Sequence, residues 1–309
     1  MQRIEAKKLG RIWRKNWQMY FLLAIPIIYV FIFSYIPIGG VVIAFKDFSA
    51  RKGIFGSDWV GLDNFIRFFQ ARSFKTILLN TLALSLYSLI ATFPVPILFA
   101  LIVNSIRSRR FSKMIQTITA LPHFISTVVM VGIIFQVLDS RSGVYGQIMY
   151  ALTQNYPETL FASPGMFRHI YVWSGAWQGF GWGSIIYIAA LTAVSPEYHE
   201  AAQIDGATRF QRTLYVDIPT ILPTVVTMLI LSMGSILSVG FEKVLLLQND
   251  LNISASEVIS TYSYAIGLNS SRPDMSYGTA IGLFNSVVNF IMIIIANTVS
   301  RKVNETSLW

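Results

Sequence analysis

Long apolar stretches, separated by shorter polar ones, run through most of the chain. A helix needs roughly 20 apolar residues to cross a bilayer. Six stretches reach or exceed that length, and they cover residues 18–45, 74–104, 115–138, 168–194, 219–241 and 277–299. The pattern therefore predicts an all-α polytopic membrane protein with six transmembrane helices. Pro26 and Pro37 are expected to kink the first helix, and Pro94 and Pro96 are expected to break the second.

The ends of the chain are polar and basic. Residues 1–17 are predicted to form an N-terminal segment, residues 18–302 the transmembrane domain and residues 303–309 a tail. The apolar run that follows the basic segment is too long for a cleavable signal. Lysine and arginine concentrate in residues 1–17 and in the short turn 107–113. Since basic residues favour the cytoplasmic side of short loops, we expect both termini to be cytoplasmic.

One connecting segment carries its own periodicity. Within residues 46–72, the apolar side chains Leu62, Phe65, Ile66 and Phe69 recur at helical spacing. This pattern predicts either an amphipathic helix at the membrane interface or a helix packed on the bundle.

The composition agrees with a membrane protein. Hydrophobic residues make up 54% of the chain and charged residues only 13%, whereas a soluble domain carries about 25% charge. The basic residues behind the net charge of +9 lie mainly in the loops and at the chain ends, so we expect membrane lipid and no nucleic acid as a partner. The chain has no cysteine and only three scattered histidines, which excludes disulfides and thiolate metal sites and disfavours a metal cluster.

The predicted spans are almost free of ionisable side chains. Apart from charged or histidine side chains at the span ends, His123 is the one histidine, acidic or basic residue inside a span, and a histidine beside a proline is more often a packing residue than a functional one. A proton- or cation-coupled carrier keeps acidic or histidine side chains deep in the membrane. The sequence also lacks a glycine-rich phosphate loop, so we expect no catalytic residues, no bound cofactor and no ATP hydrolysis by this chain.

Aromatic and neutral polar residues gather instead in the fourth and fifth spans. Close helix packing through small residues accounts for the glycines and serines. A sugar path also accounts for them, because indole rings stack on pyranose faces while amides and hydroxyls bond the sugar hydroxyls. Both interpretations remain open for Trp173, Ser174, Gly175, Trp177, Gln178, Gly179, Trp182, Ser184 and Tyr187 in the fourth span, and for Ser232, Gly234, Ser235 and Ser238 in the fifth.

The polar stretch 195–218 between these two spans has helix signals of its own. Ser195 and Pro196 open a short helix, and Glu197 and Glu200 lie in its first turns. Gly206 ends this helix or turns the backbone sharply, and a second helical piece with two arginines follows. By itself the stretch could be an ordinary connecting loop.

Its motif makes the stretch more specific. Glu200-Ala201-Ala202, then Gly206, then Val216-Asp217-Ile218-Pro219 resembles the EAA motif of permease subunits of binding-protein-dependent ABC importers. Residues 45–48, 53–56 and 59–65 are similar to the first outer loop of carbohydrate importer permeases, and residues 277–302 to their last span. The resemblance is closest to the oligosaccharide and polysaccharide branch. It implies a type I importer (MetI-like) fold.

The resemblance also implies partners. A bacterial inner-membrane permease of this kind works with two copies of a cytoplasmic ATPase, which hold the ATP and magnesium. An extracytoplasmic sugar-binding protein delivers the substrate, and a second, non-identical permease completes the path. The residues implied to dock on the ATPase are Glu197, Glu200, Ala201, Ala202, Asp205 and Gly206.

The sugar contacts implied by the resemblance lie in the spans on either side of this loop. Gly175 and Ile236 lack polar side chains, which moves part of the expected site to Ser235 or to the partner permease. With Trp177 added from the aromatic cluster, the expected path is Gly175, Trp177, Gln178, Gly179, Trp182, Ser232, Ser235 and Ile236.

Two other function classes are alternatives for a chain of this composition. A stand-alone secondary carrier or channel for a neutral solute would need a coupling-ion site or charged rings. A membrane-embedded hydrolase would need a nucleophile and a base, and His123 near Ser126 is the one candidate pair in the sequence.

Overall fold

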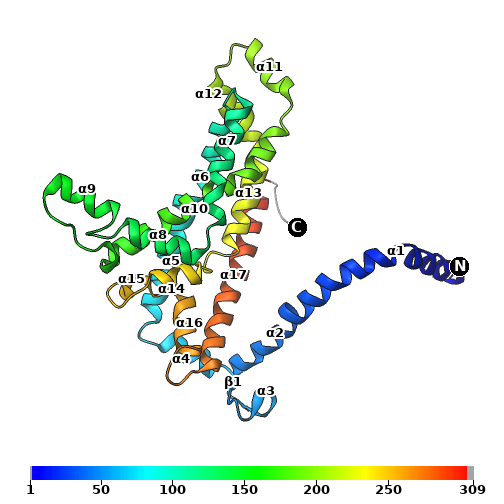
Figure 1. The fold of residues 1–309 in the computed structure, drawn as a ribbon. Coiled ribbons are helices and arrows are strands. Elements are labelled where there is room, and N and C mark those ends of the chain that lie inside the picture. The colour runs from blue at the N-terminus through cyan, green and yellow to red at the C-terminus, as the bar shows by residue number, and fades with distance from the viewer. Residues whose placement is uncertain (1, 305–309) are drawn as a thin grey trace. The chain divides into compact units, whose positions relative to one another are not determined.

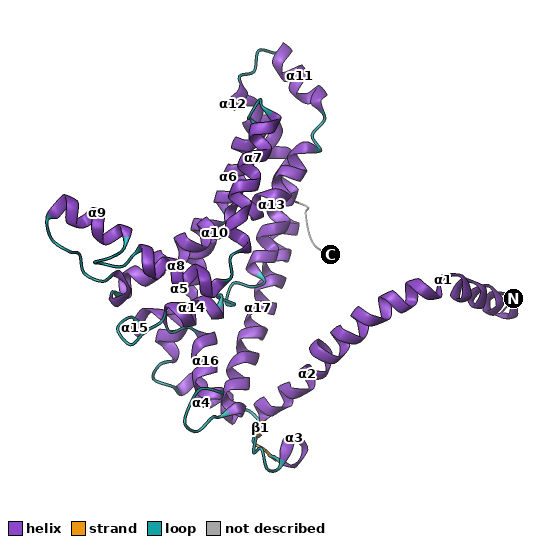
Figure 2. Cartoon of the chain, in the orientation of Figure 1, coloured by secondary structure: helices purple, strands orange, loops and turns teal. Residues whose placement is uncertain are grey.

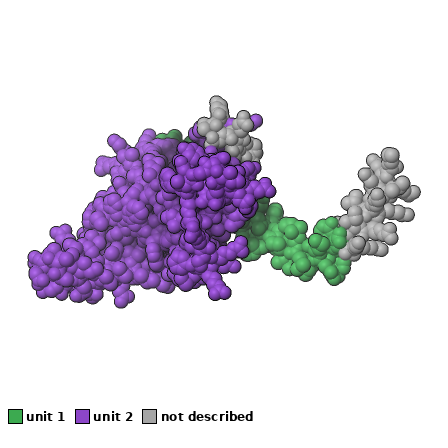
Figure 3. Space-filling view, turned by 90° about the horizontal axis from the view of Figure 1, so that it is seen from above, with its two compact units in different colours: residues 1–68, 266–283 green, residues 69–265, 284–309 purple. Residues whose placement is uncertain are grey.

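The structure is a computed structural model that describes residues 2–304 (Figure 1). Most of the tail predicted at residues 303–309 therefore lies outside the described residues. Nearly all regular structure in the described part is helical, and one short two-stranded ladder accompanies it (Figure 2). The chain forms two compact units, residues 1–68 with 266–283 and residues 69–265 with 284–309, which are coloured separately in Figure 3.

The first unit contains the first apolar stretch and the segment that follows it. A helix runs through Asn16–Phe45, with a kink at Asn16, a π-helical turn at Phe31–Tyr35 and a 3₁₀ end at Gly39–Phe45. The two prolines thus distort the helix without breaking it. From the N-terminus to Gln70, the chain forms α1 (Gln2–Val30), η1 (Phe31–Tyr35), α2 (Ile36–Ile38), η2 (Gly39–Phe45), β1 (Lys46–Asp47), α3 (Gly53–Gly56), β2 (Asp58–Trp59) and α4 (Asp63–Gln70).

The loop after this helix is folded by specific contacts. Strands β1 and β2 pair antiparallel, with Lys46 opposite Trp59. Gly53 and Gly61 have positive φ angles of 66° and 63°, which only glycine adopts at little cost. The Asn64 side chain donates hydrogen bonds to the carbonyls of Ala44 and Lys46 at 2.9 and 3.2 Å.

Helix α4 packs through a different face from the predicted one. Asn64 and Phe68 are buried, whereas Leu62 and Ile66 of the predicted apolar stripe are 59% and 49% exposed. The Arg67 guanidinium forms an ion pair with Asp274 at 2.6 Å and lies 4.2 Å from the centroid of the Tyr277 ring. Packing in this chain therefore uses the face of α4 that carries Asn64 and Phe68, while Leu62 and Ile66 of the apolar stripe stay accessible.

Four helices of the described chain are long and apolar enough to cross a membrane, and two bent pairs raise the number to six. The four are Asn16–Phe45, Phe74–Asn104, Arg209–Met233 and Met275–Arg301, and the bent pairs are Arg109–Phe124 with Thr127–Val137 and Pro164–Thr192 with Pro196–Ile204. The second span matches its predicted bounds and consists of α5 (Phe74–Thr92) and α6 (Pro94–Asn104).

The third span is broken rather than continuous. It consists of α7 (Arg109–Ala120), η3 (Leu121–Phe124) and α8 (Thr127–Val137), and its two halves meet at 99°. Pro122 has no amide hydrogen to continue the helix. Ile125 is extended, and the Ser126 hydroxyl caps the new helix by accepting from the Val129 amide at 3.4 Å. The cap explains why the apolar run 115–138 does not form one helix.

The fifth span is displaced from its predicted bounds of 219–241. Its helix begins at Arg209 and continues through α12 (Arg209–Arg212), the π-helical turn η5 (Thr213–Asp217) and α13 (Ile218–Met233). The π-helical turn accommodates Pro219 inside a continuous helix. The helix ends eight residues early, because the chain turns at 234–240 before entering α14 (Phe241–Leu247).

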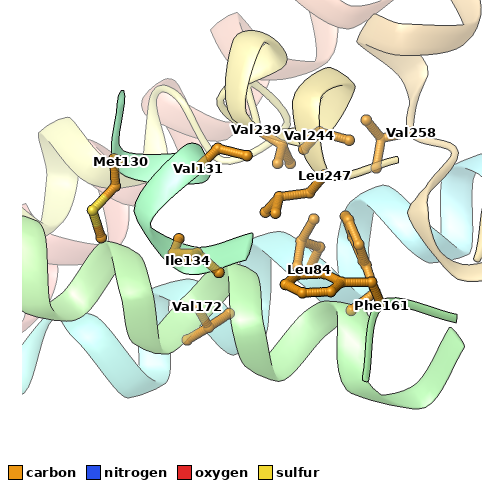
Figure 4. Packing of buried hydrophobic residues seen from close by; sticks show 11 residues of the cluster. Leu84, Met130, Val131, Ile134, Phe161, Val172, Val239, Val244, Leu247 and Val258 are labelled. Carbon is orange, nitrogen blue, oxygen red and sulfur yellow. The ribbon is translucent and has the colours of Figure 1, made fainter. Parts of the chain in front are cut away.

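Helix α10 (Pro164–Thr192) is central to the second unit and contacts α5, α6, α7, α13 and α15. The main apolar cluster, drawn in Figure 4, joins residues of α5, α8, α10 and α14. It consists of Leu84, Met130, Val131, Ile134, Phe161, Phe167, Val172, Val239, Val244, Leu247 and Val258. The remaining elements are α9 (Val144–Thr153), η4 (Leu160–Ala162), α11 (Pro196–Ile204), α15 (Ile253–Ser256), α16 (Ile259–Gly267) and α17 (Met275–Asn304).

Candidate functional site

The EAA loop, residues 195–218, begins with helix α11, as predicted. The Ser195 hydroxyl accepts a hydrogen bond from the Glu197 amide at 3.4 Å. Pro196 occupies the first turn, where a missing amide hydrogen costs nothing. The Glu197 carboxylate also lies in the first turn, where the positive end of the helix dipole stabilises it.

Gly206 ends this helix through its backbone conformation. Its φ angle is +81°, and the amide of the next residue, Ala207, donates to the Ala202 carbonyl at 2.8 Å. This is the glycine-terminated helix end in which a left-handed residue lets the chain reverse. A Cβ at Gly206 would meet no atom within 4 Å, so the left-handed conformation and not crowding inside the chain requires glycine.

The second half of the loop feeds directly into the fifth span. The Thr208 hydroxyl accepts from the Gln211 amide at 3.3 Å, while the Gln211 side-chain oxygen accepts from the Thr208 amide at 2.8 Å. This reciprocal capping box starts α12, and the helix then runs without interruption to Met233.

A contact between a partly buried histidine and a buried carboxylate ties α11 to this helix. His199 Nε2 lies 3.3 Å from Asp217 Oδ1, and the Asp217 side chain is only 6% exposed. Both residues line a pocket of about 340 Å³ that also carries Arg107, Arg209 and Arg212. The sequence analysis does not predict this contact, although Asp217, an acidic residue among apolar neighbours just before Pro219, is a signal for it.

The rest of the EAA loop is open. Of the residues expected to dock on an ATPase, Ala202 is half-buried, and Glu197, Glu200, Ala201, Asp205 and Gly206 are exposed. Helix α11 lies at one end of the second unit (Figure 1). Large apolar side chains are exposed beside these residues, namely Tyr198 at 65%, Ile204 at 87%, Phe210 at 76% and Tyr215 at 73%.

At the other end of α13 lies a second feature, which we name the serine pocket. It has a volume of about 220 Å³, and seven of its twelve lining residues carry a hydroxyl group. Three of the predicted path residues, Ser232, Ser235 and Ile236, line it. The other lining residues are Ser85, Ser88, Leu89, Thr92, Phe93, Tyr171, Ser238, Val239 and Gly240.

The wall of the serine pocket is non-helical and is held by side chains. The Asn289 carbonyl oxygen accepts from the Leu237 amide at 2.9 Å, and its NH₂ donates to the Ser238 hydroxyl at 2.8 Å. The Tyr171 hydroxyl accepts from the Gly240 amide at 3.0 Å. Backbone groups freed by the end of α13 are thus bonded by side chains from α17 and α10.

Two predicted path residues on α10, Gln178 and Trp182, contact the broken third span. The Gln178 side-chain NH₂ donates to the Ile125 carbonyl at 2.9 Å. Trp182 stacks on His123, with ring centroids 4.8 Å apart and planes within 1°. The expectation that His123 is a packing residue is confirmed. The structure thus assigns these two α10 side chains a part in holding the 99° bend.

The remaining α10 positions differ among themselves. Trp177 is 48% exposed, and a Cβ at Gly179 would meet nothing within 4 Å. A Cβ at Gly175 would come within 3.3 Å of Lys243 Nζ. Lys243, on α14, therefore occupies the space where the missing side chain of Gly175 would lie.

A polar network that the sequence did not reveal joins α5 to α10. The Tyr87 hydroxyl lies 2.8 Å from His169 Nδ1 and accepts from Trp173 Nε1 at 2.9 Å. Each residue alone gives no signal, because the network depends on the packing of two helices.

The described residues carry no group of three or more histidine, cysteine, aspartate or glutamate side chains that could hold a metal ion. The two residues of the hydrolase hypothesis have other roles: His123 stacks on Trp182, and Ser126 caps α8.

Comparison with known proteins gives consistent results. Residues 92–305 match the family described as binding-protein-dependent transport system inner membrane component. Protein LplB of Bacillus subtilis is 39% identical over 296 residues, covering 96% of this chain and 92% of that protein. The polygalacturonan/rhamnogalacturonan transport system permease protein YteP of the same organism is 38% identical, with 94% and 90% covered.

Solved structures agree in fold. A chain of a bacterial ABC transporter involved in the import of the acidic polysaccharide alginate is 37% identical and superposes with a TM-score of 0.85. The match covers 96% of this chain and 99% of that one. A chain from a bacterial alginate ABC transporter in complex with an alginate pentasaccharide-bound periplasmic protein gives a TM-score of 0.86 at 36% identity.

Proposed function

Because the chain belongs to the family of binding-protein-dependent transport system inner membrane components, we propose that it is the permease subunit of an ATP-driven importer of an oligosaccharide. The relatives support this substrate class, since their names and titles specify the transport of polygalacturonan, rhamnogalacturonan and alginate. The stand-alone carrier is the less favoured alternative.

One observation carries the mechanism: the EAA loop and the serine pocket lie at the two ends of one helix. That helix, Arg209–Met233, has 25 residues and is therefore about 37 Å long. Its start is bonded to α11 through Asp217 and His199, and its end carries Ser232. A displacement of α11 therefore moves a rigid element that reaches the pocket.

The importer cycle follows from this linkage. ATP binding closes the ATPase dimer, and the exposed residues of α11 transmit the closure to the helix Arg209–Met233. One state of the pocket then accepts sugar from outside, and ATP hydrolysis restores the other state. Each ligand shifts the balance only by binding the two states with different affinity.

We assign the partners by surface chemistry. Two copies of an ATPase, which hold ATP and Mg²⁺, would dock on the acidic and apolar residues of α11. An extracytoplasmic sugar-binding protein would deliver the substrate. The first span, Asn16–Phe45, has no buried residue in its most apolar window, so lipid and a second, non-identical permease would cover it. Both termini would face the cytoplasm.

The proposed sugar contacts fall into two groups. Ser232, Ser235 and their hydroxyl neighbours in the serine pocket would bond sugar hydroxyls, with Ile236 as the apolar wall. Along α10, Trp177 would supply a stacking ring, while Gly175 and Gly179 would leave space for the sugar. Gln178 and Trp182 would contribute through the faces not used on Ile125 and His123.

Reconstitution tests the function directly. The chain is placed in proteoliposomes with and without its ATPase, second permease and binding protein, and sugar uptake is measured. We expect uptake only in the complete complex with ATP. Uptake by the chain alone would contradict the proposal and support the carrier.

A further inference from the structure

Lys243 is a buried charge for which the importer mechanism has so far given no role. Only 9% of the residue is exposed, and its Nζ donates to the Tyr171 carbonyl at 3.0 Å. The same ammonium lies 5.0 Å from the centroid of the Tyr171 ring. Burial lowers the pKa of Lys243 to about 8, so the ammonium form still predominates at neutral pH.

No carboxylate of the described residues forms an ion pair with this ammonium. The ion pairs in that part of the chain are Lys52–Asp58, Arg67–Asp274 and His199–Asp217. Buried charges in proteins are normally paired, because removing an ion from water is costly. The carbonyl and the ring of Tyr171 supply only partial negative charge, so Lys243 can still accept an anionic partner.

The position of the ammonium connects it to the proposed sugar path. Tyr171, which binds it, also lines the serine pocket. Gly175, one helical turn further along α10, is a predicted path residue, and a Cβ there would approach Nζ to 3.3 Å. The absence of a side chain at this position therefore lets the ammonium lie directly against the α10 backbone, one turn from the pocket-lining Tyr171.

We propose that Lys243 binds a carboxylate of the transported sugar, so that the importer takes acidic, uronate-containing oligosaccharides. This inference rests on the proposed function and specifies its substrate class. A carboxylate forms short, charge-assisted hydrogen bonds with an ammonium, and the hydroxyls of the serine pocket suit the neutral part of the same sugar ring.

A purely structural role for Lys243 makes a different prediction. If the side chain only tethers α14 to α10, a neutral donor that reaches the Tyr171 carbonyl would replace it, and any loss would affect all substrates equally. Lys243→Gln keeps a hydrogen-bond donor and removes the charge. Lys243→Arg keeps the charge. Lys75→Gln makes the same change at an exposed lysine of the same unit and serves as the control.

The test uses the complete importer in proteoliposomes and matched pairs of sugars. Trigalacturonate is paired with α-1,4-galactotriose, and β-1,4-linked trimannuronate with β-1,4-mannotriose. In each pair, all three rings carry a carboxylate in the acidic sugar and a hydroxymethyl group in the neutral one. The readout is the ratio of acidic to neutral uptake, in which the contribution of the binding protein is common to all variants.

We expect Lys243→Gln to lower this ratio about tenfold or more, as expected when a charged hydrogen-bond partner is lost. Lys243→Arg should stay within about threefold of the unmodified protein, and Lys75→Gln should match it. An equal loss of both sugars in Lys243→Gln, or equal uptake of both by the unmodified importer, would overturn the carboxylate assignment alone. Uptake of neither sugar of either pair by the unmodified importer would instead overturn the proposed function.

Discussion

The two ends of the helix Arg209–Met233 differ in how their structure arises. At the first end, the EAA loop is shaped by residues close together in sequence: a serine cap, a left-handed glycine and a capping box. At the second end, the serine pocket is assembled from α5, α10 and the turn after α13, and α17 holds its wall. Local hydrogen bonding therefore specifies the EAA-loop end, and packing between distant segments specifies the pocket.

This difference determines how each end responds to mutation. A change at Glu200 or Gly206 in the EAA loop should alter coupling without unfolding the bundle, since both residues are exposed. A change around the pocket should combine effects on stability and on transport, because the same side chains hold the backbone and face the cavity.

The largest effect concerns the sides of the membrane on which the loops lie. Ser108 and Ser142 are both exposed, and the chain has no cysteine of its own. Single cysteines at these positions should label from opposite sides in intact cells, with Ser108→Cys protected from an impermeant reagent and Ser142→Cys reactive. Labelling of Ser108→Cys from outside would place the turn 107–113 on the outer side of the membrane and contradict the proposed topology.

Gly206→Val should be the most damaging single change in the EAA loop. A β-branched residue at φ +81° is strained by about 1–3 kcal/mol. We expect sugar-stimulated ATP hydrolysis by the reconstituted complex to fall more than about tenfold, while the amount of permease in the membrane stays normal.

Gly206→Asn is the matched control, because asparagine tolerates the left-handed region and a Cβ has free space there. It should retain most of the stimulation. Equal loss in both variants would mean that contact with the ATPase, and not backbone conformation, requires glycine at this position.

Around the pocket, smaller and separable effects are expected. Gln178→Ala removes the hydrogen bond to Ile125, so it should lower thermal stability by about 1 kcal/mol as well as reduce uptake. Ser235→Ala removes an exposed hydroxyl that lines the serine pocket, so it should reduce uptake severalfold at unchanged stability. Thermal unfolding of the purified complex and uptake kinetics, measured on both variants, separate the two. Unchanged stability of Gln178→Ala would show that the hydrogen bond to Ile125 does not stabilise the bend.

The same contrast explains which features could be read from the sequence. The bounds 74–104 and the helix at 196–204 follow from local signals, namely apolar length and capping residues. The 99° bend was not read, although Pro122 marked it, because hydropathy alone does not distinguish one helix from two. Hydropathy places the start of the fifth span too late, because the helical piece that carries Arg209 and Arg212 is polar and yet continues directly into the span.

The candidate site shows the same limit. Motif spacing predicts the loop and two residues that line the pocket, Ser232 and Ile236, and Ser235 follows as the polar neighbour of Ile236. It could not show that Gln178 bonds to a carbonyl 53 residues away, or that Lys243 packs against Gly175. These contacts depend on which faces of separate helices meet, and that information is not local.

The most direct test of the central claim, that the EAA loop couples an ATPase to this permease, is ATP hydrolysis by the reconstituted complex with and without sugar-loaded binding protein. Glu200 is exposed on α11, and Glu200→Lys reverses its charge without removing a contact in the core. A glutamate in an uninvolved surface loop would tolerate this change within about 0.5 kcal/mol. We expect Glu200→Lys to assemble normally and to lose the stimulation by loaded binding protein, whereas the same reversal at the exposed Glu158 should keep it. Full stimulation of the Glu200→Lys complex would contradict the claim.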